Sequence, residues 1–208
     1  MLSRKIDHLV YATNTFEETI DWFEEVSGVR PSFGGYHKSQ GTKNALVKIG
    51  EICYLEILAV DNDNLEISAP RWMGVDILKE PTLCRWAIQS EDLNADAAVL
   101  KVYNNEMGQI HYGHRKKDNG DDLNWSMILP LATPLIELAP FVIDWGTSEH
   151  PATNLESICQ LKALKFKSSN VVGINKLFRN LNIEAEINTS GSDRIIAILE
   201  TPKGLLEL

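Results

Sequence analysis

Two polar side chains interrupt apolar, strand-like runs in the first part of the chain. His8 lies in the run 6–12, and Glu56 lies in the run 52–60. Residues alternate between the two faces of a strand, so His8 shares its face with Val10. A carboxylate inside an apolar run is costly unless it is paired, hydrogen-bonded or metal-bound. Two interpretations follow: a functional pair facing a cavity, or a buried His–Glu hydrogen bond.

A glycine-rich hairpin between these two strands supplies further candidates. His37, Thr42 and Asn44 follow Gly34-Gly35 within ten residues. Glycine lets the backbone approach a ligand closely, which favours a binding role. The same residue types also build a tight turn, and the sequence does not separate the two interpretations.

The remaining histidines differ in their context. His111 and His114 are three apart on a strand, so they face opposite ways and cannot chelate one ion together. His150 precedes Pro151 in a loop that could cap a cavity, and loops often carry function. A simple turn is the alternative for His150.

Three segments with a similar order of elements would position these residues. The first, 5–60, predicts a strand, a helix and further strands; Phe16, Ile20 and Phe23 mark the helix by their spacing. The order recurs in 83–147, and more loosely in 151–208. A supersecondary unit that recurs in this way cannot bury its sheet face alone, which favours paired sheets.

Overall composition excludes several classes of function. The chain has 208 residues, of which 44% are hydrophobic and 24% charged, and its formal net charge is −9. This balance predicts a soluble globular protein and disfavours nucleic-acid and membrane partners. No signal-peptide-like apolar segment opens the sequence, so we expect a cytoplasmic protein.

Sequence motifs for several other kinds of site are missing. Three widely spaced cysteines without a CxxC pair favour buried core thiols over disulfides or zinc; they are Cys53, Cys84 and Cys159. No phosphate-binding P-loop, dinucleotide fingerprint, nucleophile elbow or HExxH string is present.

The hairpin and the Glu56 strand together resemble the glyoxalase-like domain proteins of the vicinal oxygen chelate superfamily. The shared pattern is GG-x-H-x-x-x-GT-x-N-x-L followed by YLE. It comprises Gly34, Gly35, His37, Gly41, Thr42, Asn44, Leu46, Tyr54, Leu55 and Glu56. A later PFVIDWG…HP stretch is similar as well, so the resemblance covers about the first 150 residues.

This resemblance implies an α+β fold in which repeated βαβββ units form cupped mixed sheets around a cavity. It implies a domain at 1–150, made of the units 5–60 and 83–147, followed by a third, degenerate unit at 151–208. Metal-using relatives hold a divalent ion with inward residues from the first and last strands of each unit.

The implied metal ligands are His8, Glu56 and Asp144. One imidazole with carboxylates suits Zn, Fe, Mn, Ni or Co. The second unit departs from the family pattern, because aligning the units by their helix starts places Arg85 opposite His8, with Asp144 falling opposite Glu56. Arginine is not a metal ligand. Two alternatives remain: salt-bridged pairs without metal, or a three-ligand site in which Arg85 grips an anionic substrate.

Two functions are therefore expected. The first is an enzyme acting on a small oxygen-rich metabolite with lyase, isomerase or dioxygenase chemistry, using His8 and Glu56 as metal ligands or as an acid–base pair. The second is a metal-free protein that binds or sequesters a small molecule. The expected substrate-binding residues are His37, Asn44, Arg85, Trp86 and His150. A third sheet without an obvious partner predicts a homodimer, or closure onto the first two units.

Overall fold

The computed structural model describes residues 4–116, 122–156 and 158–208. Within them the chain forms one eight-stranded sheet, one four-stranded sheet and three α-helices. In chain order the elements are β1 (Ile6–Thr13), α1 (Phe16–Ser27), β2 (Ser32–His37), η1 (Lys38–Gln40), β3 (Thr42–Gly50), β4 (Cys53–Val60), η2 (Trp72–Gly74), β5 (Thr82–Gln89), α2 (Leu93–Tyr103), β6 (Ile110–Lys116), β7 (Asp122–Ile128), β8 (Phe141–Asp144), η3 (Pro151–Asn154), β9 (Gln160–Ser168), α3 (Val171–Asn180), β10 (Ile187–Thr189), β11 (Arg194–Thr201) and β12 (Gly204–Glu207).

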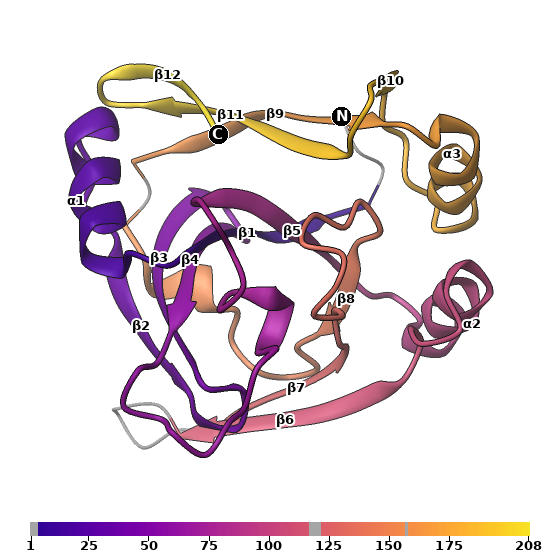
Figure 1. The fold of residues 1–208 in the computed structure, drawn as a ribbon, viewed down its shortest axis with the longest axis horizontal. Helices are drawn as coiled ribbons and strands as arrows, with labels where there is room; N and C mark the ends of the chain where they lie inside the picture. Colours follow the sequence, from indigo (N-terminus) through magenta and orange to yellow (C-terminus); the bar gives the residue numbers. More distant parts are fainter. Residues whose placement is uncertain (1–3, 117–121, 157) are drawn as a thin grey trace.

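The large sheet joins two copies of one unit through their first strands. Its order is β2-β3-β4-β1-β5-β8-β7-β6, and β1 pairs antiparallel with β5 at the centre. In each half the first strand also pairs in parallel with the last, β1 with β4 and β5 with β8. Figure 1 shows this sheet curling into a cup. The predicted α+β cup of repeated βαβββ units is confirmed.

Helix α1 illustrates how local sequence sets these elements. Phe16, Ile20 and Phe23 are buried at helical spacing, as their pattern predicts. Gly28 ends the helix at a φ of 80°, and its N–H donates to the Glu24 carbonyl. Such a left-handed residue closes a helix with little strain only when it lacks a Cβ. The helix is thereby fixed against one flank of the large sheet (Figure 1).

The four-stranded sheet, ordered β10-β9-β11-β12, covers the convex side of the cup. Phe166 and Phe178 of this layer pack on Trp86 of β5 and belong to the same core as Leu9. Its strand pairing differs from that of the first two units, because β9 pairs in parallel with β10 and antiparallel with β11. The third segment therefore closes on the first two units of the same chain.

The concave side of the cup is filled in part by the chain between β4 and β5. Met73 and Val75 from this connector form a second core with Val10, Ala12 and Leu58. These last three lie on the faces that strand alternation predicts for them. The connector therefore closes the part of the cup next to these residues. His8 is covered by other residues, Asp7, Tyr54 and Phe141.

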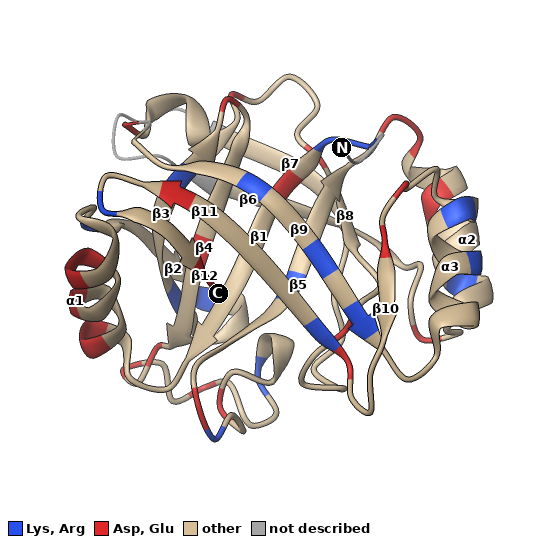
Figure 2. Cartoon of the chain, turned by 90° about the horizontal axis from the view of Figure 1, so that it is seen from above, with Lys and Arg blue, Asp and Glu red and all other residues tan. Residues whose placement is uncertain are grey.

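Charge is distributed unevenly over the surface. Figure 2 shows acidic residues along α1 and basic residues along β9. The acidic first turn of α1 suits the positive end of the helix dipole. Among the described residues, no helix is long and apolar enough to cross a bilayer.

Candidate active site

His8 and Glu56 meet on the concave face of the cup, where β1 and β4 run side by side. The His8 Nε2 atom lies 3.7 Å from Glu56 Oε2, and both side chains are at most 5% exposed. This separation is too long for a hydrogen bond. A ring nitrogen and a carboxylate oxygen therefore lie close together without forming a hydrogen bond to each other.

A bulge in β1 adds Asp7 to the site. The β1–β5 pairing shifts register between Ile6 and His8. Adjacent residues on a regular strand point to opposite faces, but a bulge turns one of them. As a result Asp7 Oδ1 lies 2.6 Å from His8 Nδ1. A carboxylate only accepts, so His8 Nδ1 carries a proton, and in the neutral ring the lone pair is on Nε2, which faces Glu56.

The second oxygen of Asp7 gathers three donors. Trp145 Nε1 donates to Oδ2 at 2.8 Å, His150 Nε2 at 3.1 Å and Gln89 Nε2 at 3.2 Å. Burial alone would raise the pKa of Asp7, but the hydrogen bonds from His150 and His8 outweigh it and hold that pKa well below its usual range. Asp7 is therefore a fixed, buried carboxylate.

Glu56 is held from the opposite side by the glycine-rich hairpin. Asn44 Nδ2 donates to Glu56 Oε1 at 2.6 Å. His37 Nε2 lies 3.9 Å from the same oxygen, and His37 Nδ1 is 3.0 Å from Thr42 Oγ1. A Cβ on Gly34 would lie 2.4 Å from Asn44 Oδ1, so the glycine makes room for this amide. The hairpin thus positions Glu56 as well as forming a turn.

Aromatic rings fix the plane of the His8 imidazole. Tyr54 stacks on it at 4.6 Å between ring centroids, and Phe141 meets it edge-on at 5.0 Å. Tyr54 also contacts the His150 ring at 5.7 Å. These contacts leave the ring little freedom to rotate, so the direction of Nε2 is set by packing as well as by Asp7.

Strand register corrects the predicted counterparts in the second unit. Leu9 pairs with Trp86 at the centre of the antiparallel β1–β5 ladder. The residues before them, His8 and Arg85, are therefore equivalent, as the sequence alignment predicts.

The counterpart of Glu56 is different from the one predicted. Val10 and Ala87 follow the central pair, and they pair with Glu56 and Phe141 respectively. Phe141, not Asp144, occupies the position equivalent to Glu56.

Asp144 lies apart from His8 and Glu56. It is exposed at the end of β8, where its Oδ1 accepts a hydrogen bond from the Gly146 N–H at 2.8 Å. The prediction that Asp144 is a third ligand beside His8 fails because the alignment by helix starts is three residues out of register at this strand.

Arg85 does not present its guanidinium to a cavity. The side chain is fully buried, and Nη1 and Nη2 donate to backbone carbonyls of Cys84, Leu131, Pro134 and Leu135. An arginine with its donors used in this way stabilises the loop 131–135. The predicted role in gripping an anionic substrate does not fit this geometry.

Trp86 belongs to the convex face, away from His8. It is fully buried against Phe166 and Phe178, and its Nε1 donates to the Leu138 carbonyl at 2.9 Å. Its predicted contact with substrate is therefore excluded by the four-stranded sheet that covers it. His37, Asn44 and His150, by contrast, all lie around the His8–Glu56 pair.

The fold implies a divalent metal site at the position of His8 and Glu56. His8 Nε2, Glu56 and His37 Nε2 converge, but Asn44 donates to Glu56 at 2.6 Å. Arg85 and Phe141 take the positions of the second unit's ligands. Among the described residues no group of three His, Cys, Asp or Glu side chains is arranged to hold an ion. The residues present do not fit this metal site.

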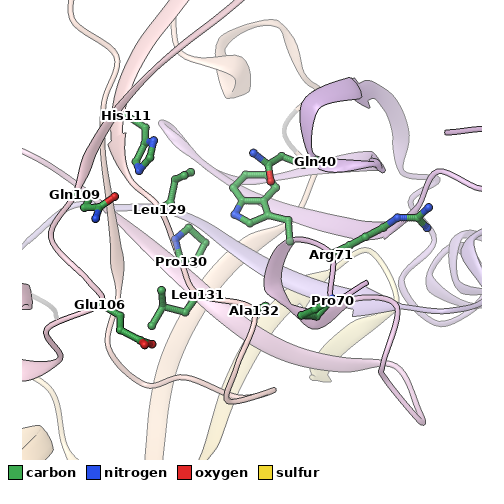
Figure 3. A pocket seen from close by; sticks show the side chains of 11 residues that line it. Gln40, Pro70, Arg71, Glu106, Gln109, His111, Leu129, Pro130, Leu131 and Ala132 are labelled. Carbon is green, nitrogen blue, oxygen red and sulfur yellow. The ribbon is translucent and has the colours of Figure 1, made fainter. Parts of the chain in front are cut away.

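Two pockets border the polar cluster, although neither is lined by His8 or Glu56. One, of about 290 Å³, lies between the connector of the first unit and the β6–β7 end of the second. Figure 3 shows Gln40 on one side of it and Gln109 and His111 on the other, with the Arg71 guanidinium turned away. Trp72 lines this pocket and contacts His37, with 5.4 Å between the ring centroids.

The other pocket, of about 360 Å³, lies along β6, β7 and the loop after β8. Trp125 and Trp145 line it, and Trp145 donates to Asp7. The cluster is thus bordered by an aromatic side chain at each pocket.

The cysteines are buried and free. Burial raises the pKa of Cys84 to about 11, and it raises those of Cys53 and Cys159 as well. Neutral thiols of this kind are poor nucleophiles, which agrees with the core role predicted for them.

Sequence reasoning missed Asp7, Gln89 and the site role of Trp145. Asp7 is adjacent to His8, and regular alternation assigns it to the opposite face. Only the bulge reverses this, and no residue in Lys5–Leu9 predicts a bulge. The one available sign that Asp7 has a role is that a charged residue precedes His8 in an apolar run.

Comparison with known proteins gives a family match and a set of similar folds. The family model described as a glyoxalase-like domain matches residues 6–181. A crystal structure of a hypothetical protein from Staphylococcus aureus is 18% identical, covers 93% of this chain and 88% of its own, and has a TM-score of 0.65.

Methylmalonyl-CoA epimerases are also among the similar structures. The Streptomyces coelicolor enzyme in complex with 2-nitronate-propionyl-CoA is 18% identical, covers 72% of this chain and 100% of its own, and has a TM-score of 0.46. The Mycobacterium tuberculosis enzyme is 16% identical, covers 68% and 88%, and has a TM-score of 0.44. No curated protein sequence matches the chain.

Proposed function

Since the chain belongs to the glyoxalase-like domain family of the vicinal oxygen chelate superfamily, we propose that it is an enzyme that moves a proton on a small oxygen-rich substrate. The reaction class is that of an isomerase or lyase working by general acid–base catalysis. The observation that carries this proposal is the His8 ring, held by Asp7 with Nε2 facing the Glu56 carboxylate at 3.7 Å.

The chemistry follows from the two groups that face each other. His8 Nε2 removes a proton from a carbon next to a carbonyl, and the electron pair moves onto the carbonyl oxygen as an enolate. In an isomerase the proton passes from His8 Nε2 to Glu56 Oε2. Glu56 then delivers it to the former carbonyl carbon, while the neighbouring hydroxyl proton moves to the enolate oxygen. In a lyase the enolate instead expels a leaving group from the adjacent carbon, and that group departs with the proton held by His8. Buried acid–base groups of this kind typically contribute roughly 100- to 10,000-fold to a rate.

Asn44 and His37 position Glu56 for the step in which it returns the proton to the substrate. Asn44 donates to Glu56 Oε1, which leaves Oε2 as the oxygen facing His8. The His37 ring stands beside the same carboxylate. Asn44 Nδ2 also lies 3.4 Å from His37 Nε2, so the amide keeps both Glu56 and His37 in place beside His8.

The pocket between Trp72 and His111 is the route by which we expect a substrate to reach this site. Its polar lining includes Gln40, Gln109 and His111, which offer both donors and acceptors, and the charged Arg71 and Glu106. The rest of its wall is Trp72 with leucine, proline and alanine side chains. Such a lining suits a small molecule with hydroxyl or carbonyl groups.

Proton exchange with solvent tests the proposal before the natural substrate is identified. The protein is incubated in D₂O with hydroxyketones and hydroxyaldehydes such as dihydroxyacetone, hydroxypyruvate and lactaldehyde, and loss of the C–H signal is followed by proton NMR. We expect exchange above the protein-free rate, falling roughly 100-fold or more in His8→Ala and Glu56→Gln.

His114→Ala is the matched control, because His114 is an exposed histidine on the other face of the β6–β7 hairpin. Exchange that persists at full rate in both site variants would contradict the assignment of His8 and Glu56. One equivalent of divalent metal that is lost in His8→Ala would contradict the metal-free mechanism.

A second candidate, a non-catalytic binding protein, is favoured by one observation. Trp72, Trp125 and Trp145 line the two pockets on either side of the polar cluster. Aromatic linings of this kind bind planar ligands without chemistry. A rise in melting temperature with planar aromatic compounds, unaffected by EDTA and without exchange of any proton, would support this candidate over the first.

A further inference from the structure

We propose that Asp7 is a positioning residue that fixes the tautomer of His8, and that the segment after β8 holds Asp7 in place for this task. The proposal rests on the proposed function for its catalytic meaning, but the tautomer itself is a property of the protein alone. Asp7 contacts the His8–Glu56 pair through its hydrogen bond to His8, so we expect it to act on the reaction through His8 and not by touching the substrate.

The first step of the argument concerns the two nitrogens of His8. Asp7 Oδ1 lies 2.6 Å from Nδ1, within a site where Asp7 is fully buried. Because a carboxylate has no proton to give, Nδ1–H must be the donor. In the neutral ring the lone pair is then on Nε2, the nitrogen that faces Glu56.

The second step concerns His150, whose tautomer is fixed independently. Its Nδ1 lies 3.1 Å from the Ala152 N–H, which can only donate. His150 Nδ1 is therefore an acceptor, and Nε2 carries the proton that it donates to Asp7 Oδ2 at 3.1 Å. The hydrogen bond from the Ala152 N–H to His150 Nδ1, at the start of η3, thus determines that the proton of the neutral His150 ring is on the nitrogen that faces Asp7.

The third step shows that Asp7 cannot easily turn. Trp145 and Gln89 donate to the same Oδ2 as His150 does. Three donors on one oxygen fix the carboxylate plane, so that Oδ1 alone remains for His8. Two of these donors, Trp145 and His150, belong to the segment that follows β8. The site in the first unit is therefore incomplete without a segment more than 130 residues away in sequence.

Imidazole nitrogen NMR on the full chain tests this proposal. The protein is labelled with ¹⁵N-histidine, and the His8 signals are assigned by their loss in His8→Ala. In the wild-type protein we expect Nδ1 to be protonated and Nε2 to show the shift of an unprotonated nitrogen. In Asp7→Asn the amide can donate to Nδ1, so the proton should move to Nε2.

A second pair of variants keeps the test decisive if Asp7→Asn does not fold. His150→Ala removes a donor from Asp7 and should give a mixture of His8 tautomers, whereas His150→Gln retains an amide donor and should preserve the wild-type tautomer. His114→Ala, outside the cluster, should leave the His8 signals unchanged. A wild-type His8 protonated on Nε2, or an unchanged tautomer in folded Asp7→Asn or in His150→Ala, would overturn the proposal.

Turnover separates this inference from the proposed function. Where proton exchange is measurable, Asp7→Asn should lower kcat by roughly 100-fold or more while KM changes little, because the substrate contacts stay in place. A correct tautomer without exchange would defeat the proposed function alone. Full activity of a folded Asp7→Asn variant with the reversed tautomer would defeat the positioning role alone.

Discussion

At the scale of single residues, the site combines side chains that regular alternation places together with one that it does not. His8 and Glu56 share a face as their positions in two apolar strands predict, and Asn44 reaches them from the neighbouring strand. Asp7 joins them through a bulge, which depends on how β1 pairs with β5 and is not encoded in any short stretch. The sequence therefore predicts the pair but not its orienting carboxylate.

Acid stability tests the charged state of Asp7. Its pKa in the folded protein is depressed, so it stays ionised there while the unfolded chain takes up a proton near its ordinary pKa of about 4. The stabilisation is therefore present above that pH and is lost as the pH falls toward the folded-state value. In urea titrations, Asp7→Asn should lower the free energy of unfolding at pH 7 by about 1.5–3 kcal/mol, and the difference from wild type should shrink below pH 4.

A difference between the two proteins that is constant from pH 7 to pH 3 would contradict this assignment of charge. His114→Ala serves as the reference, because His114 lies outside the contacts of Asp7.

Gly34 tests whether the hairpin positions Glu56. A Cβ at this position would lie 2.4 Å from Asn44 Oδ1 and 2.9 Å from Leu46 Cγ. Gly34→Ala should therefore displace the amide from Glu56 and destabilise the protein by about 1–3 kcal/mol, as overpacking usually does. Gly191→Ala, with no atom within 4 Å of its Cβ, should change stability by less than about 0.5 kcal/mol. Equal melting temperatures for the two variants would show that the hairpin accommodates the added methyl group without loss of stability, and would contradict this prediction.

At the scale of elements, the helices follow their sequence signals closely, apart from one cap. Asp92 accepts from the N–H groups of Asn94 and Ala95, and Asn170 accepts from that of Gly173; both are residue types that favour the N-cap position. Thr15 precedes α1 but its side chain makes no capping bond. The residue before a helix predicts the capping side chain well when only one candidate is present. It predicts it less well where several candidates adjoin, as in Thr13–Thr15.

The capping difference gives a matched pair of variants. Asp92→Ala removes two hydrogen bonds at the start of α2 and should cost about 1 kcal/mol of stability. Thr15→Ala removes no capping bond and should cost less than about 0.5 kcal/mol. Chemical denaturation of both variants measures this, and a larger loss for Thr15→Ala would show that α1 depends on its start in another way.

At the scale of the whole molecule, the third segment is the part that the sequence describes least well. Its order of strand, helix and three strands is readable, but its pairing differs from that of the other units, and it packs on the convex face of its own chain. This position explains why Trp86 was misassigned, since an aromatic residue on a strand can face either layer. Which sheet covers which face depends on contacts between distant segments, which local patterns do not contain.

The shared core predicts that the layers unfold together. Phe166→Ala removes a fully buried ring that contacts Trp86 and Phe178, and should cost about 3–5 kcal/mol. The exposed Val172→Ala in α3 should change stability by less than about 0.5 kcal/mol. Unfolding followed by tryptophan fluorescence and by far-ultraviolet circular dichroism should coincide in both variants. Separate transitions would mean that the four-stranded sheet is an independent unit.

The twofold relation between β1 and β5 has a consequence for the symmetry of the cup. His8 and Arg85 occupy equivalent positions, as do Glu56 and Phe141. In the second unit these positions hold an arginine that binds the carbonyls of a loop and a phenylalanine that packs edge-on against His8. The backbone of the cup is therefore close to symmetric while its chemistry is one-sided, so a ligand that binds at His8 and Glu56 has one such position per chain rather than two.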